Sequence, residues 1–372
     1  MRKFYIKLAV LLILVCELST HSLAQVSVSK VDNNYPVTSN TGFYYSLPQT
    51  VLKIDIVFEK VQQLVGPLSS YTNEYLGITD YISSNKTEYN LLNVEISSFQ
   101  ESDPNQLYYV QFPAERSKDA KSNIFFLSKT GSLIAYNSQA PIANATSQKV
   151  TDQTYIFNEG DDSFSYMSQY NKRKKTDTIV RTINIDTVTI NRFLYRTTWV
   201  DKNESDKAKD AALQIEKIRE SRYNLISGYQ EVNYGSSIIY MDQQLQKMED
   251  EYLELFVGQS IKSIESRTIY FIPNRGNKNA ELLRFSDGKS VVINVDMNGQ
   301  QSKVSELPAT SLNSIYYRIP SSANISVTSA NINYFTGRFV INQFGIVTTT
   351  PLDNSKLQFD GKTGNLINIV KE

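Results

Sequence analysis

Residues 44–48 read Tyr-Tyr-Ser-Leu-Pro, and residues 316–320 read Tyr-Tyr-Arg-Ile-Pro. Each stretch leads into an alternating apolar run, Leu52 to Phe58 in the first case and Ile325 to Val327 in the second. Alternation with a period of two is typical of a strand that buries one face and wets the other. The same phrase therefore enters a strand at both ends of the chain.

A second match follows each of these stretches in the same order. Lys129-Thr130-Gly131 follows Ile124-Phe125-Phe126, Lys362-Thr363-Gly364 follows Leu357-Gln358-Phe359, and each Lys-Thr-Gly precedes a Leu-Ile pair. Such punctuation is typical of a hairpin turn, where glycine adopts positive φ at little cost. We interpret the two matches as a duplicated β unit, with chance similarity of turn residues as the alternative. Phe126 and Phe359 are then expected to point into equivalent cores.

The middle of the chain changes from strand to helix periodicity. Apolar positions spaced three and four apart form two heptad seams, which predict two helices. Gly228 and Gly258 stand where C-terminal caps belong, and Ser205 and Ser236 or Ser237 can cap the starts. The seams are Ala208, Ala211, Ile215, Ile218, Arg222 and Leu225, followed by Ile238, Met241, Leu245, Met248, Tyr252 and Leu255.

The short linker between the seams predicts an antiparallel helical hairpin. In that register Arg222 lies opposite Met241 and its guanidinium reaches Asp242, while Leu245 is buried. Packing of the helices on each other and on the body is favoured over a projecting arm that grips a partner.

The fold class predicted is α+β, predominantly β, with two related antiparallel β units and a central antiparallel helical hairpin. The expected organisation is a signal peptide over 1–24, a flexible leader over 25–43, an N-terminal β-rich domain over 44–200, the helical hairpin over 201–258 and a C-terminal β-rich domain over 259–372. Further strands are expected at Tyr89 to Ile96, Leu107 to Phe112, Ile124 to Tyr136 and Thr178 to Val200. Pro67 is expected to open a short helix with Leu68, Tyr71 and Tyr75 on one side.

The first 25 residues predict export. Three basic residues precede the unbroken apolar run Leu8 to Val15, and Ser22-Leu23-Ala24 supplies small residues where a signal peptidase reads. Cleavage between Ala24 and Gln25 is expected. The protein is then expected in the periplasm or at the outer membrane.

A lipid anchor on Cys16 is the less favoured alternative, because Val15 stands where a lipobox needs a small residue. The apolar run is about half the ~20 residues that span a bilayer, and no later stretch is longer. No transmembrane segment is therefore predicted in the mature chain.

Composition removes several function classes. The one cysteine and the one histidine, Cys16 and His21, both fall in the predicted signal peptide, so thiol and imidazole catalysis and histidine-ligated zinc are excluded for the mature chain. Its 35 basic and 37 acidic residues give about −2, which offers no footprint for nucleic acid. The basic cluster Lys172 to Lys175 is expected to be a solvated loop.

Two motifs resemble functional sites, but their sequence context favours structural roles. Ser83 to Lys86 fits Ser-x-x-Lys, and Lys-Thr-Gly and Ser329 to Asn331 resemble the other elements of acyl-serine enzymes, but Ser83 lies in a turn-like stretch and not at a helix start. Asn294 to Gly299 approximates a calcium loop, yet a tight Asn-Gly hairpin turn explains it better. No catalytic, cofactor-binding or metal-binding residue is predicted.

The chain has 24 tyrosines, several of them in adjacent pairs. Tyr44, Tyr45, Tyr316 and Tyr317 are candidates for a surface that binds a sugar or a peptide, because tyrosine brings a large contact area with a polar tip. The alternative is one core ring and one rim ring per pair, since neighbours in a strand point to opposite faces.

The chain also resembles an exported bacterial family known as domain of unknown function 4831. The resemblance rests on recurring phrases that extend over nearly the whole mature chain: Tyr44 to Thr50, Gly66-Pro67, Tyr75 to Ile78, Tyr316 to Pro320 and Gln343-Phe344-Gly345. It implies the cell envelope of Gram-negative bacteria of the Bacteroidetes type. It brings no activity and no catalytic residues.

These observations favour a non-catalytic envelope protein that binds or assembles with another envelope protein or a glycan; no oligomeric state is predicted. The alternative is a carboxylate-dependent glycoside hydrolase or a carbohydrate-binding protein, because a pair of acids is a catalytic kit that needs neither histidine nor cysteine. Acids ~5 Å or ~6.5 to 9.5 Å apart in a cleft would favour the hydrolase. No acid pair in the sequence is singled out by its spacing.

Overall fold

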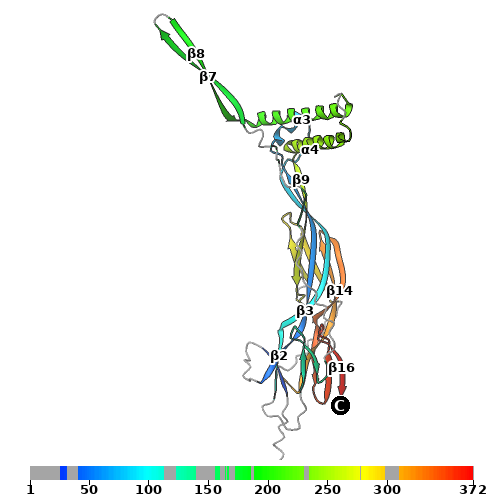
Figure 1. Cartoon of the computed structure of the whole chain (residues 1–372). Coiled ribbons are helices and arrows are strands. Elements are labelled where there is room, and N and C mark those ends of the chain that lie inside the picture. The colour runs from blue at the N-terminus through cyan, green and yellow to red at the C-terminus, as the bar shows by residue number, and fades with distance from the viewer. Residues whose placement is uncertain are drawn as a thin grey trace, which may run out of the picture.

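The computed structural model describes residues 26–31, 41–112, 123–139, 156–159, 164, 166, 172–185, 188–229, 234–276, 278–297 and 310–371. These residues form a rod (Figure 1). The C-terminus lies in the base of the rod, long strands make its shaft, and two helices lie across its other end beside a projecting two-stranded hairpin.

Strands dominate the described residues, and the helices among them lie in two places in the sequence. The first half contains β1 (Ser27–Lys30), β2 (Gly42–Leu64), η1 (Ser69–Tyr71), α2 (Thr72–Leu76), β3 (Lys86–Gln111), β4 (Phe125–Leu127), β5 (Leu133–Tyr136), β6 (Ile156–Glu159) and β7 (Lys172–Ile185). The second half contains β8 (Val188–Asp201), α3 (Glu204–Ser227), α4 (Ser237–Val257), β9 (Gln259–Phe271), β10 (Asn279–Arg284), β11 (Ser290–Asp296), β12 (Thr310–Leu312), β13 (Ser314–Ser329), β14 (Ile332–Pro351), β15 (Ser355–Phe359) and β16 (Leu366–Lys371).

The shaft is built on the long antiparallel pair β2 and β3. The predicted alternation in β2 is confirmed, because Leu52, Ile54, Ile56 and Phe58 are at most 1 % exposed. With 23 residues, β2 extends over about 75 Å at ~3.3 Å per residue. The two separate strands expected at Tyr89 and Leu107 are parts of the single strand β3, in which residues 97 to 102 also pair with β2.

Two sheets face each other along the shaft. A six-stranded sheet has the order β12-β1-β3-β2-β9-β6, and a four-stranded sheet has the order β10-β11-β13-β14. Their inner faces share one core, in which Ile54 and Phe58 of the first sheet pack with Ile293, Ile325 and other apolar residues of the second. The fold is therefore α+β and predominantly β, as predicted.

The two related β units have the same order of elements. A long hairpin (β2–β3 or β13–β14) is followed by a short hairpin around Lys-Thr-Gly (β4–β5 or β15–β16). The N–H of Ser46 donates to the carbonyl oxygen of Gly131 at 3.1 Å, and the N–H of Arg318 donates to that of Gly364 at 3.3 Å. Ser46 and Arg318 occupy the same place in the two tyrosine phrases, so the same hydrogen bond recurs in both units.

The two short hairpins lie side by side in one four-stranded sheet, ordered β16-β15-β5-β4. Gly131 and Gly364 both have the predicted positive φ, 78° and 71°. The prediction for the aromatic residues was half wrong: Phe359 is 1 % exposed, but Phe126 is 38 % exposed. Phe125 packs on the core in its place, because the register of β4 turns its ring inward.

Strands from the two predicted β-rich regions share sheets. β9 and β12, from the C-terminal region, pair with β2 and β1. Ser27–Lys30, part of the segment predicted as a flexible leader, forms β1 and buries Val28 completely. Residues 32–40 of that leader lie outside the described residues. So do Ala24 and Gln25 of the predicted cleavage site.

The helical hairpin forms where the seams predicted it. Its proximal half buries Ala208, Ile215 and Leu255 against Leu68, while Tyr71 and Tyr75 pack at the margin, so the short helix after Pro67 is the platform for the long ones. Gly228 caps α3 with φ 69° and Gly258 ends α4. Asn203, not Ser205, caps α3: its side chain accepts from the N–H of Asp206, while the Ser205 hydroxyl bonds that of Tyr75 at 2.9 Å.

An ion-pair network joins the two helices farther out. Arg222 Nε donates to Asp242 Oδ1 at 3.0 Å, as predicted, and its Nη1 donates to Glu249 at 3.2 Å. Arg219 reaches the same glutamate at 2.7 Å. Leu245 packs on the helical core but is only half-buried, which is less burial than the heptad pattern predicted.

Candidate binding surface on two projecting arms

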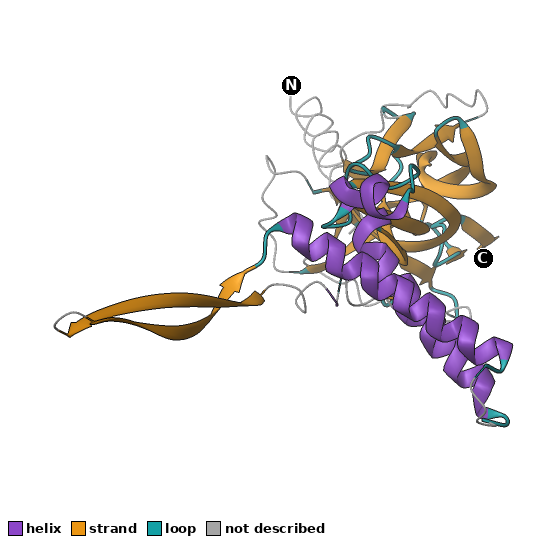
Figure 2. Ribbon diagram, turned by 90° about the horizontal axis from the view of Figure 1, so that it is seen from above, coloured by secondary structure: helices purple, strands orange, loops and turns teal. Residues whose placement is uncertain are grey.

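The hairpin of β7 and β8, here called the β-arm, stands away from the rest of the molecule. Its 14-residue strands form a sheet of their own in the described part of the chain, antiparallel from Lys172↔Asp201 to Ile185↔Val188. Figures 1 and 2 show the arm leaving the shaft on the side away from the long helices. The strand pattern predicted for Thr178 to Val200 is confirmed, and β7 begins earlier than expected.

One face of the β-arm is aromatic. Phe193 lies opposite Val180, Tyr195 opposite Thr178 and Trp199 opposite Lys174. Directly opposed residues share a face, and every second residue along a strand returns to it. The three rings are 56 %, 72 % and 68 % exposed, so this face shows a row of large side chains to solvent.

The other face combines an apolar pair with a pair of cations. Ile179 lies opposite Leu194, and Arg181 lies opposite Arg192. Ile179 is 49 % and Leu194 38 % exposed, and both arginines are exposed. Like charges directly opposite each other destabilise a strand pair. This face therefore favours contact with an anionic group.

The basic cluster Lys172 to Lys175 belongs to this arm. It is exposed, as expected, but it lies on β7 and not in a loop, because each residue pairs with β8. Residues 172 to 201 contain seven basic and three acidic side chains, a net charge of +4. The cationic character of the arm thus comes from both strands.

The helices α3 and α4 form a second projection, here called the helical arm. Figure 2 shows them extending past the sheets on the side opposite the β-arm. The exposed side chains include Leu213 (44 %) and Tyr223 (71 %), and Ile226, Ile239 and Tyr240 are 64–65 % exposed near the far end. The proximal half packs on the body as expected, whereas the far half projects.

The helical arm is acidic. Residues 204 to 257 contain six basic and eleven acidic side chains, a net charge of −5. Burial, with the neighbouring Glu251 and Asp250, raises the pKa of Glu254. Acids in the last turns of a helix also face the negative end of its dipole. Negative potential therefore accumulates on this arm.

The two arms meet at their roots. Arg173 of the β-arm donates to Asp206 of α3 at 3.1 Å, and Lys202 in the connection pairs with Asp210. Beyond these contacts the arms diverge (Figure 2).

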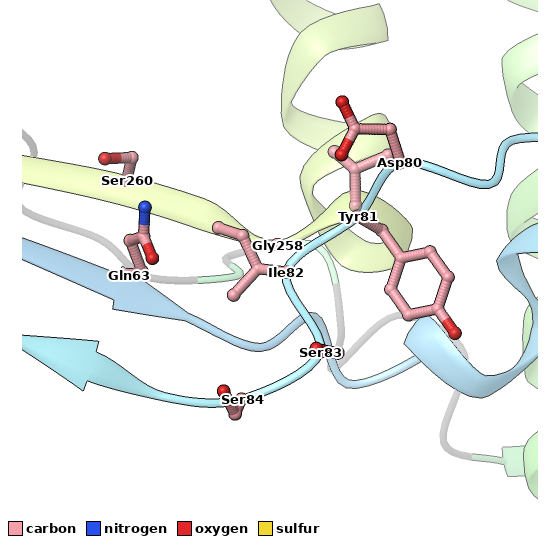
Figure 3. A pocket seen from close by; sticks show the side chains of 9 residues that line it. Gln63, Asp80, Tyr81, Ile82, Ser83, Ser84, Gly258 and Ser260 are labelled. Carbon is pink, nitrogen blue, oxygen red and sulfur yellow. The ribbon is translucent and has the colours of Figure 1, made fainter.

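A cavity of about 480 Å³ lies where α4 ends against the shaft (Figure 3). Gln63, Tyr81, Ile82, Ser83, Ser84, Val257, Gly258 and Ser260 line it together with one acid, Asp80. Ser83 lies in a coil segment, and Lys86 of the same motif pairs with Glu88. The lining thus provides neither an acid pair nor a serine with an adjacent lysine.

The tyrosine candidates divide between surface and core. Tyr44 is 49 % exposed and Tyr317 partly exposed, whereas Tyr45 and Tyr316 are 1 % and 2 % exposed. The last two are therefore core residues and not surface contacts. Each pair supplies one inner and one outer ring, because successive strand residues face opposite sides.

The buried tyrosines form a stack that joins the two β units. The ring of Tyr108 lies 5.3 Å from that of Tyr45 and 4.6 Å from that of Tyr316. Burial raises the pKa of all three hydroxyls, so they remain protonated and act as hydrogen-bonding groups. Nearby, Arg318 donates to Pro48 O and Asp103 Oδ2 at 2.8 and 2.9 Å in a buried ion pair.

The other motifs have structural roles. Both Lys-Thr-Gly triplets lie in hairpin turns. Ser329 ends β13, and Ala330 and Asn331, both at positive φ, form the turn to β14. Asn294 and Asp296 lie on β11, and Asn298 and Gly299 lie outside the described residues. Among the described residues, no cluster of three or more acids, cysteines or histidines could hold a metal ion.

A family model described as domain of unknown function (DUF4831) matches residues 41–366, which is most of the chain. The chain belongs to this family. The match covers both β units and both arms, so the arms lie within the DUF4831 region. No curated protein and no solved structure matches the chain. Within the part of the chain that the structure describes, no helix is long and apolar enough to cross a membrane.

The sequence analysis did not identify the β-arm as a site. A usable signal was present: Thr178 to Val200 has apolar residues in both phases of the alternation, with cations among them. A strand that is apolar on both faces is normally covered on both faces. Where no other element covers it, the exposed apolar face indicates an interaction site.

Proposed function

We propose that this chain is an exported component of the cell envelope that binds or assembles with a partner and has no catalytic role. The observation that carries the proposal is the aromatic face of the β-arm, held at the far end of a rod. An isolated two-stranded hairpin is marginally stable in water. Aromatic residues are enriched at protein interfaces relative to the rest of the surface, so a row of exposed aromatic side chains indicates an interaction site.

The shape of the molecule supports this role. The rod separates the base from the arms by the length of the β2–β3 pair, so the arms reach a partner some distance from the base. Apolar side chains and the tyrosine stack fill the interior, and this packing makes the rod rigid. A rigid shaft with an exposed aromatic face at one end is suited to a component of an assembly.

Export is the second part of the proposal, and it rests on the basic start, the apolar run and Ser22-Leu23-Ala24. The location is the periplasm or the outer membrane of a Bacteroidetes-type envelope, as the family resemblance implies. The intact mass of the native protein tests it: we expect a chain that begins at Gln25 or its cyclised form. A lipid-modified Cys16, or an unprocessed chain, would contradict this part.

The rival function, a carboxylate-dependent glycoside hydrolase or a carbohydrate-binding protein, receives less support from the described residues. The cavity in Figure 3 contains one carboxylate, Asp80, where hydrolysis needs two.

The binding role is tested on the aromatic face. In cells that express Phe193→Ser/Tyr195→Ser/Trp199→Ser, we expect the native complex, detected by crosslinking and native electrophoresis of the envelope, to dissociate. Leu92→Ser is the matched control, because Leu92 is 49 % exposed on the shaft. A complex that survives the triple substitution, or no complex with the wild-type chain, would refute the proposal.

A further inference from the structure

The outer edge of β7 is exposed to solvent. Within the described part of the chain, β7 pairs with β8 and with no other strand, and every residue from 172 to 182 is exposed. A strand at the edge of a sheet presents a row of unpaired N–H and C=O groups, which is a template for pairing with another strand. A two-stranded hairpin is marginally stable alone, so the β-arm would gain stability from further strands.

The charges along β7 are complementary to those of a second β7. In an antiparallel pair, residues directly opposite each other lie on the same face of the sheet. Asp177, the one acid in β7, lies on the same face as Arg181, because an even number of residues separates them. When Asp177 lies opposite Arg181 of a second copy, the reverse pair forms as well. Ile179, midway between them, then lies opposite Ile179 of that copy on a twofold axis.

The rest of this register contains no pair of like charges. Lysines on a strand edge normally discourage pairing, but here Lys174 and Lys175 lie opposite uncharged residues. The overlap extends over residues 173–185, whereas pairing Asp177 with Lys175 would shorten it to residues 172–180. Pairing Asp177 with Arg173 would set Lys175 opposite its own copy. The remaining opposed pairs are Thr178 with Val180, Thr176 with Thr182, Lys175 with Ile183, Lys174 with Asn184 and Arg173 with Ile185.

The edge of β8 offers no such match. Its one acid, Asp201, lies on one face, whereas Arg192 and Arg196 lie on the other. No register of β8 with itself can therefore set the acid opposite an arginine. Of the two edges of the β-arm, only that of β7 is complementary in charge to its own copy.

This pairing would also relieve a repulsion within the β-arm. Arg181 lies opposite Arg192 of β8, and like charges in that position destabilise a strand pair. Asp177 of the second copy would lie on the other side of Arg181, one strand spacing of about 4.8 Å away and in the same row across the sheet. The arginine would then have a carboxylate beside it as well as a cation.

We infer that β7 pairs with β7 of a second copy of the chain, antiparallel about a twofold axis at Ile179, in a four-stranded sheet ordered β8-β7-β7-β8. The β-arm stands away from the shaft, so the two shafts lie at opposite ends of the shared sheet (Figure 1). The inference goes beyond the proposed function, because it uses the edge of β7 and not the aromatic face. The aromatic faces of both copies then lie on one side of the sheet.

The size of the contact is that of a dimer that dissociates on dilution. Residues 173–185 extend over about 43 Å at ~3.3 Å per residue, and a sheet with its side chains is about 10 Å thick. The edges therefore bury about 900 Å² in total, which is below the ~1,200 Å² of a standard stable interface. The concentration dependence of dimerisation is accordingly part of the test.

The test is disulfide trapping in the purified protein of residues 25–372, which contain no cysteine. Opposed Cα atoms in an antiparallel pair are about 4.5–5.5 Å apart, within the ~4.4–6.8 Å that a disulfide spans. On mild oxidation at protein concentrations from about 1 μM to about 1 mM, Ile179→Cys should form a covalent dimer on non-reducing gels. The yield should rise with concentration.

Leu194→Cys is the matched control, because Leu194 lies opposite Ile179 in the same hairpin and is also exposed. In the four-stranded sheet it lies three strand spacings, about 14 Å, from its own copy, which is too far for a disulfide. Its yield should be lower by at least about tenfold, a difference that random collision of exposed thiols would not produce. Circular dichroism establishes that each variant is folded.

Charge exchange in the Ile179→Cys background tests the register. Asp177→Arg sets two arginines opposite each other twice and should lower the trapping rate by about tenfold. Asp177→Arg/Arg181→Asp restores both opposite-charge pairs and should restore most of the rate. No trapping through Ile179→Cys, equal trapping through Leu194→Cys, or no recovery in the double exchange would overturn the inference. If trapping fails while the envelope complex still depends on Phe193, Tyr195 and Trp199, the proposed function stands and the dimer does not.

Discussion

The hydroxyl of Tyr45 accepts a hydrogen bond from the N–H of Tyr316 at 3.0 Å and donates one to the carbonyl oxygen of the same residue at 3.1 Å. The two tyrosines are 271 residues apart in sequence and belong to the matching phrases of the two β units. The bond is buried, and it therefore ties the units together through one side chain and one backbone.

The first prediction concerns this link. Tyr45→Phe keeps the ring in the stack but removes both hydrogen bonds, which leaves buried polar groups of the partner backbone without the hydroxyl. We expect unfolding to become easier by about 1–3 kcal/mol, measured by urea denaturation. Tyr44→Phe is the control, because this exposed neighbour should change stability by less than about 0.5 kcal/mol. Equal effects of the two substitutions would contradict the role assigned to Tyr45.

The second prediction uses the equivalent glycines of the two turns. Alanine at either position pays about 1–2 kcal/mol for positive φ. A Cβ at Gly364 would also lie 2.8 Å from Pro48 Cδ, whereas at Gly131 the nearest atom is Ser46 Oγ at 4.0 Å. Gly364→Ala should therefore destabilise the protein more than Gly131→Ala, by a further ~1–3 kcal/mol from overpacking. Thermal unfolding of the two variants side by side decides it, and the reverse order would show that the turns are not packed as described.

The third prediction concerns the helical arm. Ile215 is completely buried, so Ile215→Ala should cost about 2–5 kcal/mol. Leu245 is only half-buried, and Leu245→Ala should cost about 1–2 kcal/mol, because less apolar surface returns to water. Denaturation followed by helical circular dichroism measures both. A larger loss at Leu245 than at Ile215 would place the interhelical core farther out along the arm.

The fourth prediction concerns acid stability. Burial opposes ionisation of Glu249, but hydrogen bonds from Arg219 and Arg222 outweigh it and lower the pKa of this carboxyl. A lowered pKa in the folded state stabilises the fold above the unfolded pKa of about 4.3, and this contribution is lost as pH falls through the folded value. Glu249→Gln should therefore destabilise the arm at pH 7, by about 1 kcal/mol, and flatten its acid response.

Glu254 is the matched control with the opposite sign. Burial and its acidic neighbours raise the pKa of this carboxyl, so its ionised form costs stability at neutral pH. Glu254→Gln should make the helical arm more stable at pH 7 and should not remove the loss on acidification. The pH dependence of unfolding, followed by circular dichroism of both variants, separates the two groups. The same sign of effect at pH 7 for both substitutions would contradict the assignment.

Most of the local structure followed from periodicity in the sequence. These local signals are the alternation from Leu52 to Phe58, the two heptad seams and the glycines at turns. Each can be read within a few residues, because the backbone geometry of strands, helices and turns is set over that distance. The similarity of the two β units was visible for the same reason, since the matched phrases preserve both the turn residues and the phase of the strands. Arg222 could be paired with Asp242 because an antiparallel hairpin with a short linker fixes the register.

The tertiary structure decided which surfaces are covered. Phe125 and Phe126 are alike in sequence, and only the register of β4 with β5 turned the first inward. Residues 97 to 102 of β3 pair with β2, although most of their side chains are polar. Lys172 to Lys175 and Trp199 lie on an exposed hairpin because no other described strand pairs with it. Burial depends on what the rest of the chain places opposite a residue, and that information is not contained in its neighbours in sequence.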